Sequence, residues 1–253
     1  MRGAEPRREI NSTDVLTAGD RSSLEAAMAT PSLTSVPLPD RRAAGRALAE
    51  QLERYRGRAP VVLALPRGGV PVAFEIAQRL GAPLDLLVLR KIGAPSNPEY
   101  GLGAVVEGGT RFLDVARVRA AGLTVRELGP TIAREAAEVE RRASEFRKGT
   151  PAIDVRGRTV ILVDDGVATG GSVIAAVQAI RGRAPHEVVI ALGVAPEDTV
   201  AVLRKQVDDL VVLLVPTVFF AVGEWYRQFS QVSDAEVRRL LERSGFGSSP
   251  TER

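Results

Sequence analysis

Five short apolar runs recur along this chain, and none of them alternates with polar residues. They span residues 61–65, 84–89, 159–163, 188–192 and 210–215. A strand with one solvated face alternates in polarity, whereas a strand buried on both faces stays apolar throughout. The runs therefore predict strands of a parallel sheet that helices cover on both sides.

Helix-like segments separate the apolar runs. Asp40 is suited to cap a helix whose apolar face carries Ala44, Leu48 and Leu52. Further helices are expected at residues 71–80, 125–147, 171–183 and 196–206. The longest has an apolar face made of Leu128, Ile132, Ala136, Val139, Ala143 and Phe146. Because strands and helices alternate, we expect an α/β fold with a Rossmann-like, doubly wound, mostly parallel sheet.

Neither an internal repeat nor a linker interrupts residues 40–245, so one domain is expected there. Residues 1–39 lack apolar periodicity and predict a poorly ordered extension, in which residues 16–28 could form a short helix. Residues 246–253 are expected to be a tail.

Composition excludes several classes of protein. The chain has 253 residues, no cysteine, and 34 basic against 31 acidic residues without a basic stripe, so we expect neither thiol chemistry nor nucleic-acid binding. The most apolar stretch, residues 210–223, is shorter than the roughly 20 residues of a membrane span. The sequence favours a cytoplasmic protein without a membrane partner.

The most informative segment is residues 160–172, Val-Ile-Leu-Val-Asp-Asp-Gly-Val-Ala-Thr-Gly-Gly-Ser. A buried strand delivers Asp164 and Asp165 to its carboxyl end, and a glycine-rich turn then enters a helix. Backbone N–H groups at such a helix N-terminus, with the hydroxyls of Thr169 and Ser172, suit a phosphate. The two carboxylates suit sugar hydroxyls or a bridging cation, so a phosphorylated sugar satisfies both halves.

An apolar strand that ends in Asp-Asp also occurs in P-loop NTPases and at phospho-acceptor sites. However, the sequence contains no Gly-x-x-x-x-Gly-Lys-Ser/Thr, which argues against a P-loop NTPase.

Residues 160–172 resemble the phosphoribosyl-pyrophosphate (PRPP) signature of the type I phosphoribosyltransferases, and the similarity extends over about residues 40–245. The resemblance implies that family's fold, with a small C-terminal hood or helical extension. It also implies that Asp164 and Asp165 hold the ribose hydroxyls, directly or with Mg²⁺. The 5′-phosphate would lie on Ala168, Thr169, Gly170, Gly171 and Ser172.

Arg67, Gly68 and Gly69 follow the first strand, where the family has its pyrophosphate loop. Glycines let the backbone approach an anion, and Arg67 supplies a charged fork. The alternative is a tight turn into the next helix.

Residues 90–103 are rich in Gly, Pro, Ser and Asn, and predict a mobile loop over the site. By resemblance, Arg90 and Lys91 would reach the pyrophosphate, with Lys91 and Arg67 stabilising its departure. Glu99 begins a Glu-Tyr-Gly that is similar to the lid of the adenine enzyme, and would act as acid or base. The alternatives are a solvated surface loop and, for Glu99, the start of a strand that runs to Val106.

The acceptor is the least determined part. Ala168 stands where hypoxanthine-guanine enzymes carry a general-base Asp, which argues against that subgroup. Trp225 and Tyr226 are candidates to stack on an acceptor ring, whereas Phe219 and Phe220 favour a small core or a dimer contact.

Together these residues predict a phosphoribosyltransferase that binds Mg²⁺ and PRPP and transfers the phosphoribosyl group to a small acceptor, a nucleobase being one candidate. A homodimer is compatible with this interpretation. The alternatives are a non-catalytic PRPP sensor on the same fold and a phosphate-ester hydrolase.

Overall fold

The computed structural model of the protein describes residues 36–245. The predictions for residues 1–35 and 246–253 lie outside the described residues. Within residues 36–245, no helix combines the length and apolar character that a membrane crossing requires.

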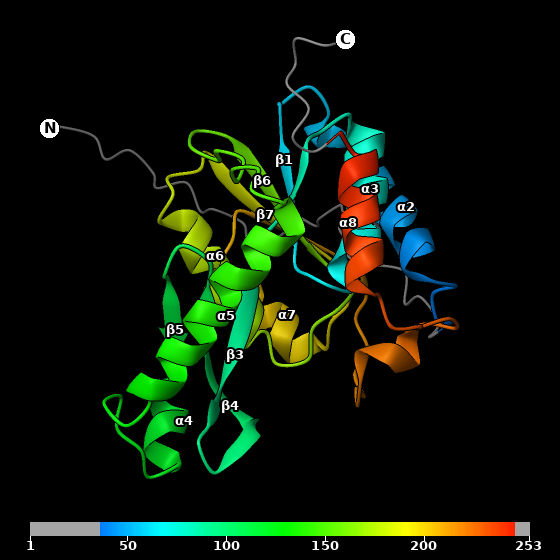
Figure 1. The fold of residues 1–253 in the computed structure, drawn as a ribbon. Helices are drawn as coiled ribbons and strands as arrows, with labels where there is room; N and C mark the ends of the chain where they lie inside the picture. Colours follow the sequence, from blue (N-terminus) through cyan, green and yellow to red (C-terminus); the bar gives the residue numbers. More distant parts are fainter. Residues whose placement is uncertain (1–35, 246–253) are drawn as a thin grey trace, which may run out of the picture. The chain divides into compact units, whose positions relative to one another are not determined.

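Five parallel strands form the central sheet, in the order β2-β1-β6-β7-β8. Figure 1 labels its three middle strands, β1, β6 and β7. Neighbouring strands pair in parallel, for example Val61 with Val160 and Thr159 with Glu187. The strands are β1 (Val61–Ala64), β2 (Leu84–Leu86), β6 (Thr159–Asp164), β7 (Glu187–Val194) and β8 (Asp209–Leu214). The expected α/β fold with a parallel sheet is therefore confirmed.

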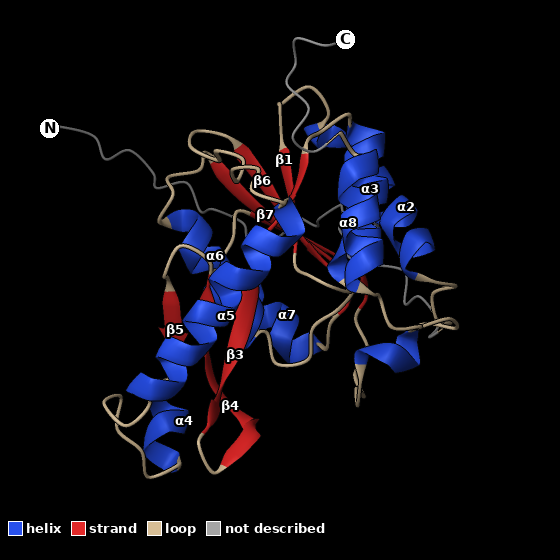
Figure 2. Ribbon diagram, in the orientation of Figure 1, coloured by secondary structure: helices blue, strands red, loops and turns tan. Residues whose placement is uncertain are grey.

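Helices cover both faces of this sheet, as the secondary-structure view shows (Figure 2). Val62 and Ala64 pack in a core with α2, α3 and α8, whereas Val61 and Leu63 pack in a second core with α6 and α7. These helices are α2 (Arg41–Gln51), α3 (Gly69–Leu80), α6 (Gly171–Arg181), α7 (Glu197–Leu203) and α8 (Asp234–Arg243). Burial on both faces explains why the strand sequences do not alternate. Asp40 caps α2 as expected, because its side chain accepts a hydrogen bond from the Ala43 N–H.

A second, antiparallel sheet was not predicted. It contains β3 (Leu89–Ala94), β4 (Asn97–Val106) and β5 (Arg111–Leu113), followed by α4 (Val115–Ala120) and α5 (Gly129–Arg147). The expected strand at residues 84–89 is wrong in its extent, because β2 ends at Leu86 and a strand of the other sheet begins at Leu89. One continuous apolar run gives no sign of such a change of sheet.

Residues 90–103, which the sequence predicts to form a loop, belong to a β-hairpin instead. Its two strands pair between Leu89 and Val106, with irregular register on either side of Gly93. A Cβ at Gly93 would fall 2.2 Å from the Pro98 carbonyl oxygen, so the strands approach too closely there for any other residue. Glycine and proline therefore serve an irregular hairpin here rather than a loop.

A buried ion cluster joins the two sheets. The Arg147 Nε atom, at the end of α5, donates to Asp85 Oδ1 of β2 at 2.8 Å, and its Nη2 atom donates to Glu107 Oε1, just after β4, at 2.9 Å. All three residues are buried. Their mutual pairing compensates the cost of removing these charges from water.

Segments from the two ends of the domain pair beside the sheet. The Leu38 N–H donates to the Trp225 carbonyl, and the Arg227 N–H donates to the Leu38 carbonyl, each at 2.8 Å. Leu38, two residues before the expected start of the domain, therefore pairs with its C-terminal part.

Candidate active site

Three loops meet where β1, β6 and β7 end at the carboxyl edge of the parallel sheet. They comprise residues 65–68, 165–170 and 195–196, and each leads into the next helix. In open parallel sheets, ligands bind at this edge.

Asp164 and Asp165 each commit one carboxylate oxygen to the protein. Asp164 Oδ1 accepts a hydrogen bond from the Asp165 N–H at 2.9 Å, and Asp165 Oδ2 accepts one from Arg41 Nε at 2.7 Å. The two carboxyl side chains also contact each other, and no other described residue donates a hydrogen bond to Asp164 Oδ2 or Asp165 Oδ1. Burial and the neighbouring Asp165 carboxylate raise the pKa of Asp164 well above its usual value. The pair therefore presents two oxygens that a hydroxyl or cation can use.

The glycines after β1 pack directly on these acids. A Cβ on Gly68 would lie 2.1 Å from Asp165 Oδ2, and one on Gly69 would lie 2.5 Å from the Val163 carbonyl oxygen. Only glycine permits so close an approach. The structure thus brings the predicted pyrophosphate loop against the predicted ribose carboxylates. The Pro66–Arg67 peptide bond is cis, and Arg67 Nη1 lies 3.6 Å from Asp234 Oδ1 of α8.

The glycine-rich turn leads directly into a helix, as the sequence predicts. Gly170 has a φ of +71°, and α6 begins at the next residue. The hydroxyl of Thr199 donates to the Ala168 carbonyl at 2.6 Å, which fixes the turn against α7. Ala168 and Thr169 are exposed, and Ser172 is half-buried in the first turn of α6. The start of an 11-residue helix beside two exposed residues is suited to an anion.

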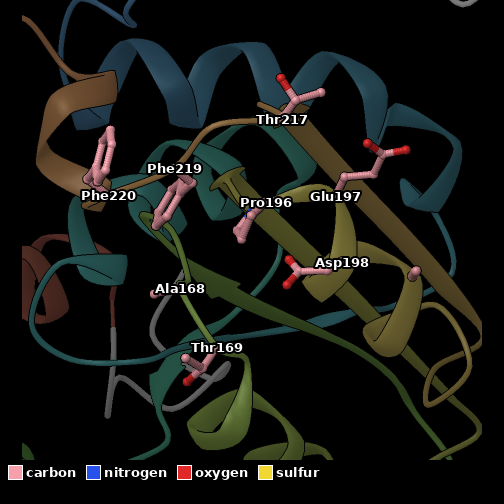
Figure 3. A pocket seen from close by; sticks show the side chains of 9 residues that line it. Ala168, Thr169, Pro196, Glu197, Asp198, Thr217, Phe219 and Phe220 are labelled. Atoms are coloured by element: carbon pink, nitrogen blue, oxygen red, sulfur yellow. The ribbon is translucent and has the colours of Figure 1, made fainter.

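Two cavities flank the loop after β6. The smaller, about 430 Å³, is lined by Arg41, Pro66, Arg67, Gly68, Asp164, Asp165, Phe229, Gln231 and Val232. The larger, about 670 Å³, is lined by Ala168, Thr169, Pro196, Glu197, Asp198, Ala201, Thr217, Phe219 and Phe220 (Figure 3). Arg41 and Arg67 line the smaller cavity, whereas the larger cavity reaches Ala168 and Thr169 near the end of the loop after β6.

The aromatic residues after β8 lie in different environments. Tyr226 is 5% exposed, stacks on Phe229 with ring centroids 5.2 Å apart, and donates its hydroxyl to the Asp165 carbonyl oxygen at 2.5 Å. Gly193 makes room, because a Cβ there would lie 1.9 Å from the Tyr226 hydroxyl. Tyr226 therefore supports the site, and neither it nor Trp225 lines either cavity.

Phe219 packs against a small apolar cluster of Ala44, Val194, Leu214 and Tyr226, as the small-core interpretation expects. Phe219 and Phe220 also line the larger cavity. Phe220 is 80% exposed. An aromatic cluster in the sequence does not reveal which rings turn inward, because the irregular chain after β8 has no periodicity.

Arg41 is a site residue that the sequence analysis missed. Besides Asp165, its guanidinium donates to the Ser230 carbonyl at 2.7 Å and lies 3.8 Å from the Phe229 ring centroid. No local pattern marks it, because its partners are distant in sequence.

Arg90 and Lys91, two of the predicted lid residues, line neither cavity. Arg90 Nε donates to Glu135 Oε2 of α5 at 2.5 Å, and Lys91 is exposed on β3. Glu99 belongs to β4, and the prediction for its side chain lies outside the described part of the structure.

The carboxylate pair also bears on the expected Mg²⁺. Among residues 36–245, no group of three or more His, Cys, Asp or Glu residues could hold a metal. Mg²⁺ prefers hard oxygen ligands and is commonly held by one or two carboxylates plus substrate phosphates. Asp164 and Asp165 therefore fit a Mg²⁺ ion whose remaining ligands come from a bound phosphate compound and water.

The fold and the site together define an α/β protein in which a carboxylate pair and a glycine-rich turn follow one strand of a parallel sheet. Residues 38–227 match the family model described as the phosphoribosyl transferase domain. The chain belongs to the phosphoribosyl transferase family.

Two relatives are similar over most of this chain. Mycobacterium tuberculosis proteins named "Putative phosphoribosyl transferase", from the strains CDC 1551 and H37Rv, are 46% identical over 205 residues. That alignment covers 81% of this chain but 46% of theirs, so the chain spans about half their length. The crystal structure of TT1426 from Thermus thermophilus is 43% identical, with a TM-score of 0.71, and the match covers 82% of this chain and 99% of that one.

Proposed function

We propose that this protein binds PRPP with Mg²⁺ and transfers its phosphoribosyl group to a small acceptor, releasing pyrophosphate. The observation that carries the proposal is the contact between two loops, residues 65–68 and 165–170. Gly68 packs on Asp165, the carboxyl of Asp165 lies beside that of Asp164, and the turn at Gly170 opens α6 further along the same loop. A diphosphate, a sugar diol and a monophosphate would each meet a suitable group.

In this proposal the carboxylates accept hydrogen bonds from the ribose hydroxyls, and Ala168, Thr169, Gly170, Gly171 and Ser172 bind the 5′-phosphate. Asp164 and Asp165 would also hold Mg²⁺. When bound, that ion supplies positive charge to the diphosphate.

Arg67 and the backbone of Gly68 and Gly69 bind the pyrophosphate on the cavity side of Asp165. The positive charge of Arg67 then opposes the negative charge that grows on the departing group. The protein needs only to position the two substrates and to stabilise the charge on the departing pyrophosphate. No covalent nucleophile is therefore required.

The roles of Lys91, Glu99 and Arg90 depend on the β3–β4 hairpin. Lys91 would reach the pyrophosphate only if the β3–β4 hairpin moves toward the site, and Glu99 stays a candidate acid or base on the same hairpin. Arg90 pairs with Glu135, so we assign it to holding β3 on α5 unless that pair opens.

The partners of this protein would be PRPP and a small acceptor in the cytoplasm, without nucleic acid or membrane, and the chain would be able to form a homodimer.

A pyrophosphate-release assay tests this function. Purified protein is mixed with Mg²⁺ and PRPP, with and without each of a panel of bases and amines. We expect release that depends on an acceptor. Binding without release for every acceptor would favour the sensor, and release without any acceptor would favour a hydrolase.

A further inference from the structure

The two arginines that line the smaller cavity are held in different ways. Arg41 Nε donates to Asp165 Oδ2 at 2.7 Å, and both side chains are 11% exposed. Arg67 Nη1 lies 3.6 Å from Asp234 Oδ1, which is too long for a hydrogen bond. No described residue accepts a hydrogen bond from the Arg67 side chain. Arg41 is therefore fixed within the protein, whereas the N–H groups of Arg67 remain available to a ligand.

Asp234 has a carboxylate oxygen without a hydrogen-bond donor. Its Oδ1 atom is buried, although the side chain as a whole is 37% exposed, and no described residue donates a hydrogen bond to this atom. A buried acceptor without a partner costs free energy. Because Arg67 is the cation beside this oxygen, Asp234 attracts its guanidinium toward the start of α8.

A helix anchored in the core determines where Asp234 lies. Asp234 is the first residue of α8, which packs on α3 (Figure 1). One face of α8 is buried in the core through Val237, Leu240 and Leu241. Arg67, by contrast, belongs to the loop of residues 65–68. The carboxylate therefore has a fixed place, from which it can restrain a side chain of the loop.

We propose that Asp234 is a positioning residue, which holds the Arg67 guanidinium at the wall of the smaller cavity, where it meets the diphosphate of PRPP. The inference rests on the PRPP binding proposed above. Arg67 lines the cavity while it lies beside Asp234, so one edge of its five-donor guanidinium can face the carboxylate and another the ligand. Restraining a side chain with so many rotamers before the ligand arrives reduces the entropy lost on binding.

A carboxylate near an anion site also has an opposing effect, because like charges repel. If Asp234 only screened the charge of Arg67, removing its charge would strengthen the binding of a diphosphate. If Asp234 positions Arg67, the same change weakens that binding. The two interpretations thus predict changes of opposite sign.

Glu236 offers a matched control. Asp234 and Glu236 both lie in the first turn of α8, where carboxylates stabilise a helix N-terminus, but Glu236 forms no ion pair with a described residue. Glu236→Gln therefore removes an equal charge from the same turn without touching Arg67. Asp234→Asn and Glu236→Gln should lower the Tm by similar, small amounts, because exposed charge pairs contribute little to stability.

Calorimetry without an acceptor tests the proposal, with three probes: inorganic pyrophosphate and PRPP, each with Mg²⁺, and ribose 5-phosphate. Asp234→Asn should weaken the binding of pyrophosphate and PRPP by about fivefold or more, whereas Glu236→Gln should change it by less than about twofold. Asp234→Glu, which keeps the charge but moves the carboxylate, should bind with intermediate affinity. Ribose 5-phosphate has no diphosphate, so all these proteins should bind it equally, whereas a general structural defect would weaken it too.

A double-mutant cycle with Arg67→Gln shows whether Asp234 acts through Arg67. In that background Asp234→Asn should have no further effect on pyrophosphate affinity. Tighter or unchanged pyrophosphate binding in Asp234→Asn, an equal loss in Glu236→Gln, or the same loss with and without Arg67 would overturn the role of Asp234 while PRPP binding stands. Wild type that binds neither PRPP nor pyrophosphate would overturn this inference and the proposed function together.

Discussion

The guanidinium of Arg41 and the carboxylate of Asp165 form an ion pair at 2.7 Å in which each side chain is 11% exposed. Arg41 is the first residue of α2, and Asp165 follows β6, so the pair ties the start of the domain to the centre of the site. Through Ser230 and Phe229, the same guanidinium also holds the C-terminal segment. Arg41 therefore orients the Asp165 carboxylate through Oδ2 and leaves Oδ1 available to a ligand.

Arg41→Gln should lower both stability and PRPP affinity. A lost hydrogen bond between charged groups costs about 2–3 kcal/mol, which corresponds to a fall in Tm of about 5–10 °C for a domain of this size. Arg41→Lys should recover part of the Tm but less of the affinity, because an ammonium cannot reproduce the guanidinium contacts. Thermal melts and calorimetry check this. An unchanged Tm in Arg41→Gln would contradict the proposal that Arg41 stabilises the fold through Asp165 and the C-terminal segment.

Gly68→Ala should weaken PRPP binding at least tenfold. The added methyl group would lie 2.1 Å from Asp165 Oδ2, so the carboxylate or the loop must move. Gly129→Ala is the control, because nothing lies within 4 Å of a Cβ at that first position of α5. The control should bind PRPP like wild type in calorimetry. Equal affinity in all three proteins would mean that this close packing has no bearing on the ligand.

Lys91→Ala should reduce kcat far more than PRPP affinity. If the hairpin closes after binding, the lysine contributes most when pyrophosphate gains charge, so its loss appears in the chemical step. Loss of one such contact typically costs about a hundredfold. Lys205→Ala, at another exposed lysine, should change the rate by less than about twofold. Single-turnover pyrophosphate release measures the rate of each variant. Similar rates in Lys91→Ala and Lys205→Ala would mean that Lys91 is an ordinary surface lysine without a role in the reaction.

Tyr55 should resist ionisation in the folded protein. Burial and the hydrogen bond from its hydroxyl to Asp209 raise its pKa to about 12. Since the unfolded pKa is about 10, its contribution to stability is complete below about pH 10 and disappears as the pH rises through about 12. Tyrosinate difference absorbance between wild type and Tyr55→Phe should show no Tyr55 signal until above pH 10. An ordinary titration there would contradict the buried contact.

The sequence is sufficient to predict features that correspond to a local pattern of residues. The five parallel strands follow from apolar runs without alternation, and the turn at Gly170 follows from the spacing of glycines and hydroxyls before a helix. Asp40 was recognisable as a cap because the helix periodicity begins just after it.

Other features depend on contacts between distant parts of the chain. The pairing of Arg41 with Asp165 spans 124 positions, and no periodicity encodes it. The hairpin at residues 90–103 resembled a loop because Gly93 and Pro98, which fit its irregular register, are also loop residues. The packing of Tyr226 against Gly193 likewise decides which aromatic residue is buried, and it appears only in three dimensions.

Thermal melting with PRPP tests the central claim most directly. The measurement compares Tm with PRPP and Mg²⁺, with PRPP alone, and in the variant carrying both Asp164→Asn and Asp165→Asn. At 100 times its Kd, a ligand stabilises by about 2.7 kcal/mol, which predicts a rise in Tm of about 5–10 °C. That rise should require Mg²⁺ and should be absent from the double variant, which should still unfold cooperatively. No shift of the wild type at millimolar PRPP with Mg²⁺, or an equal shift in the folded double variant, would contradict the account.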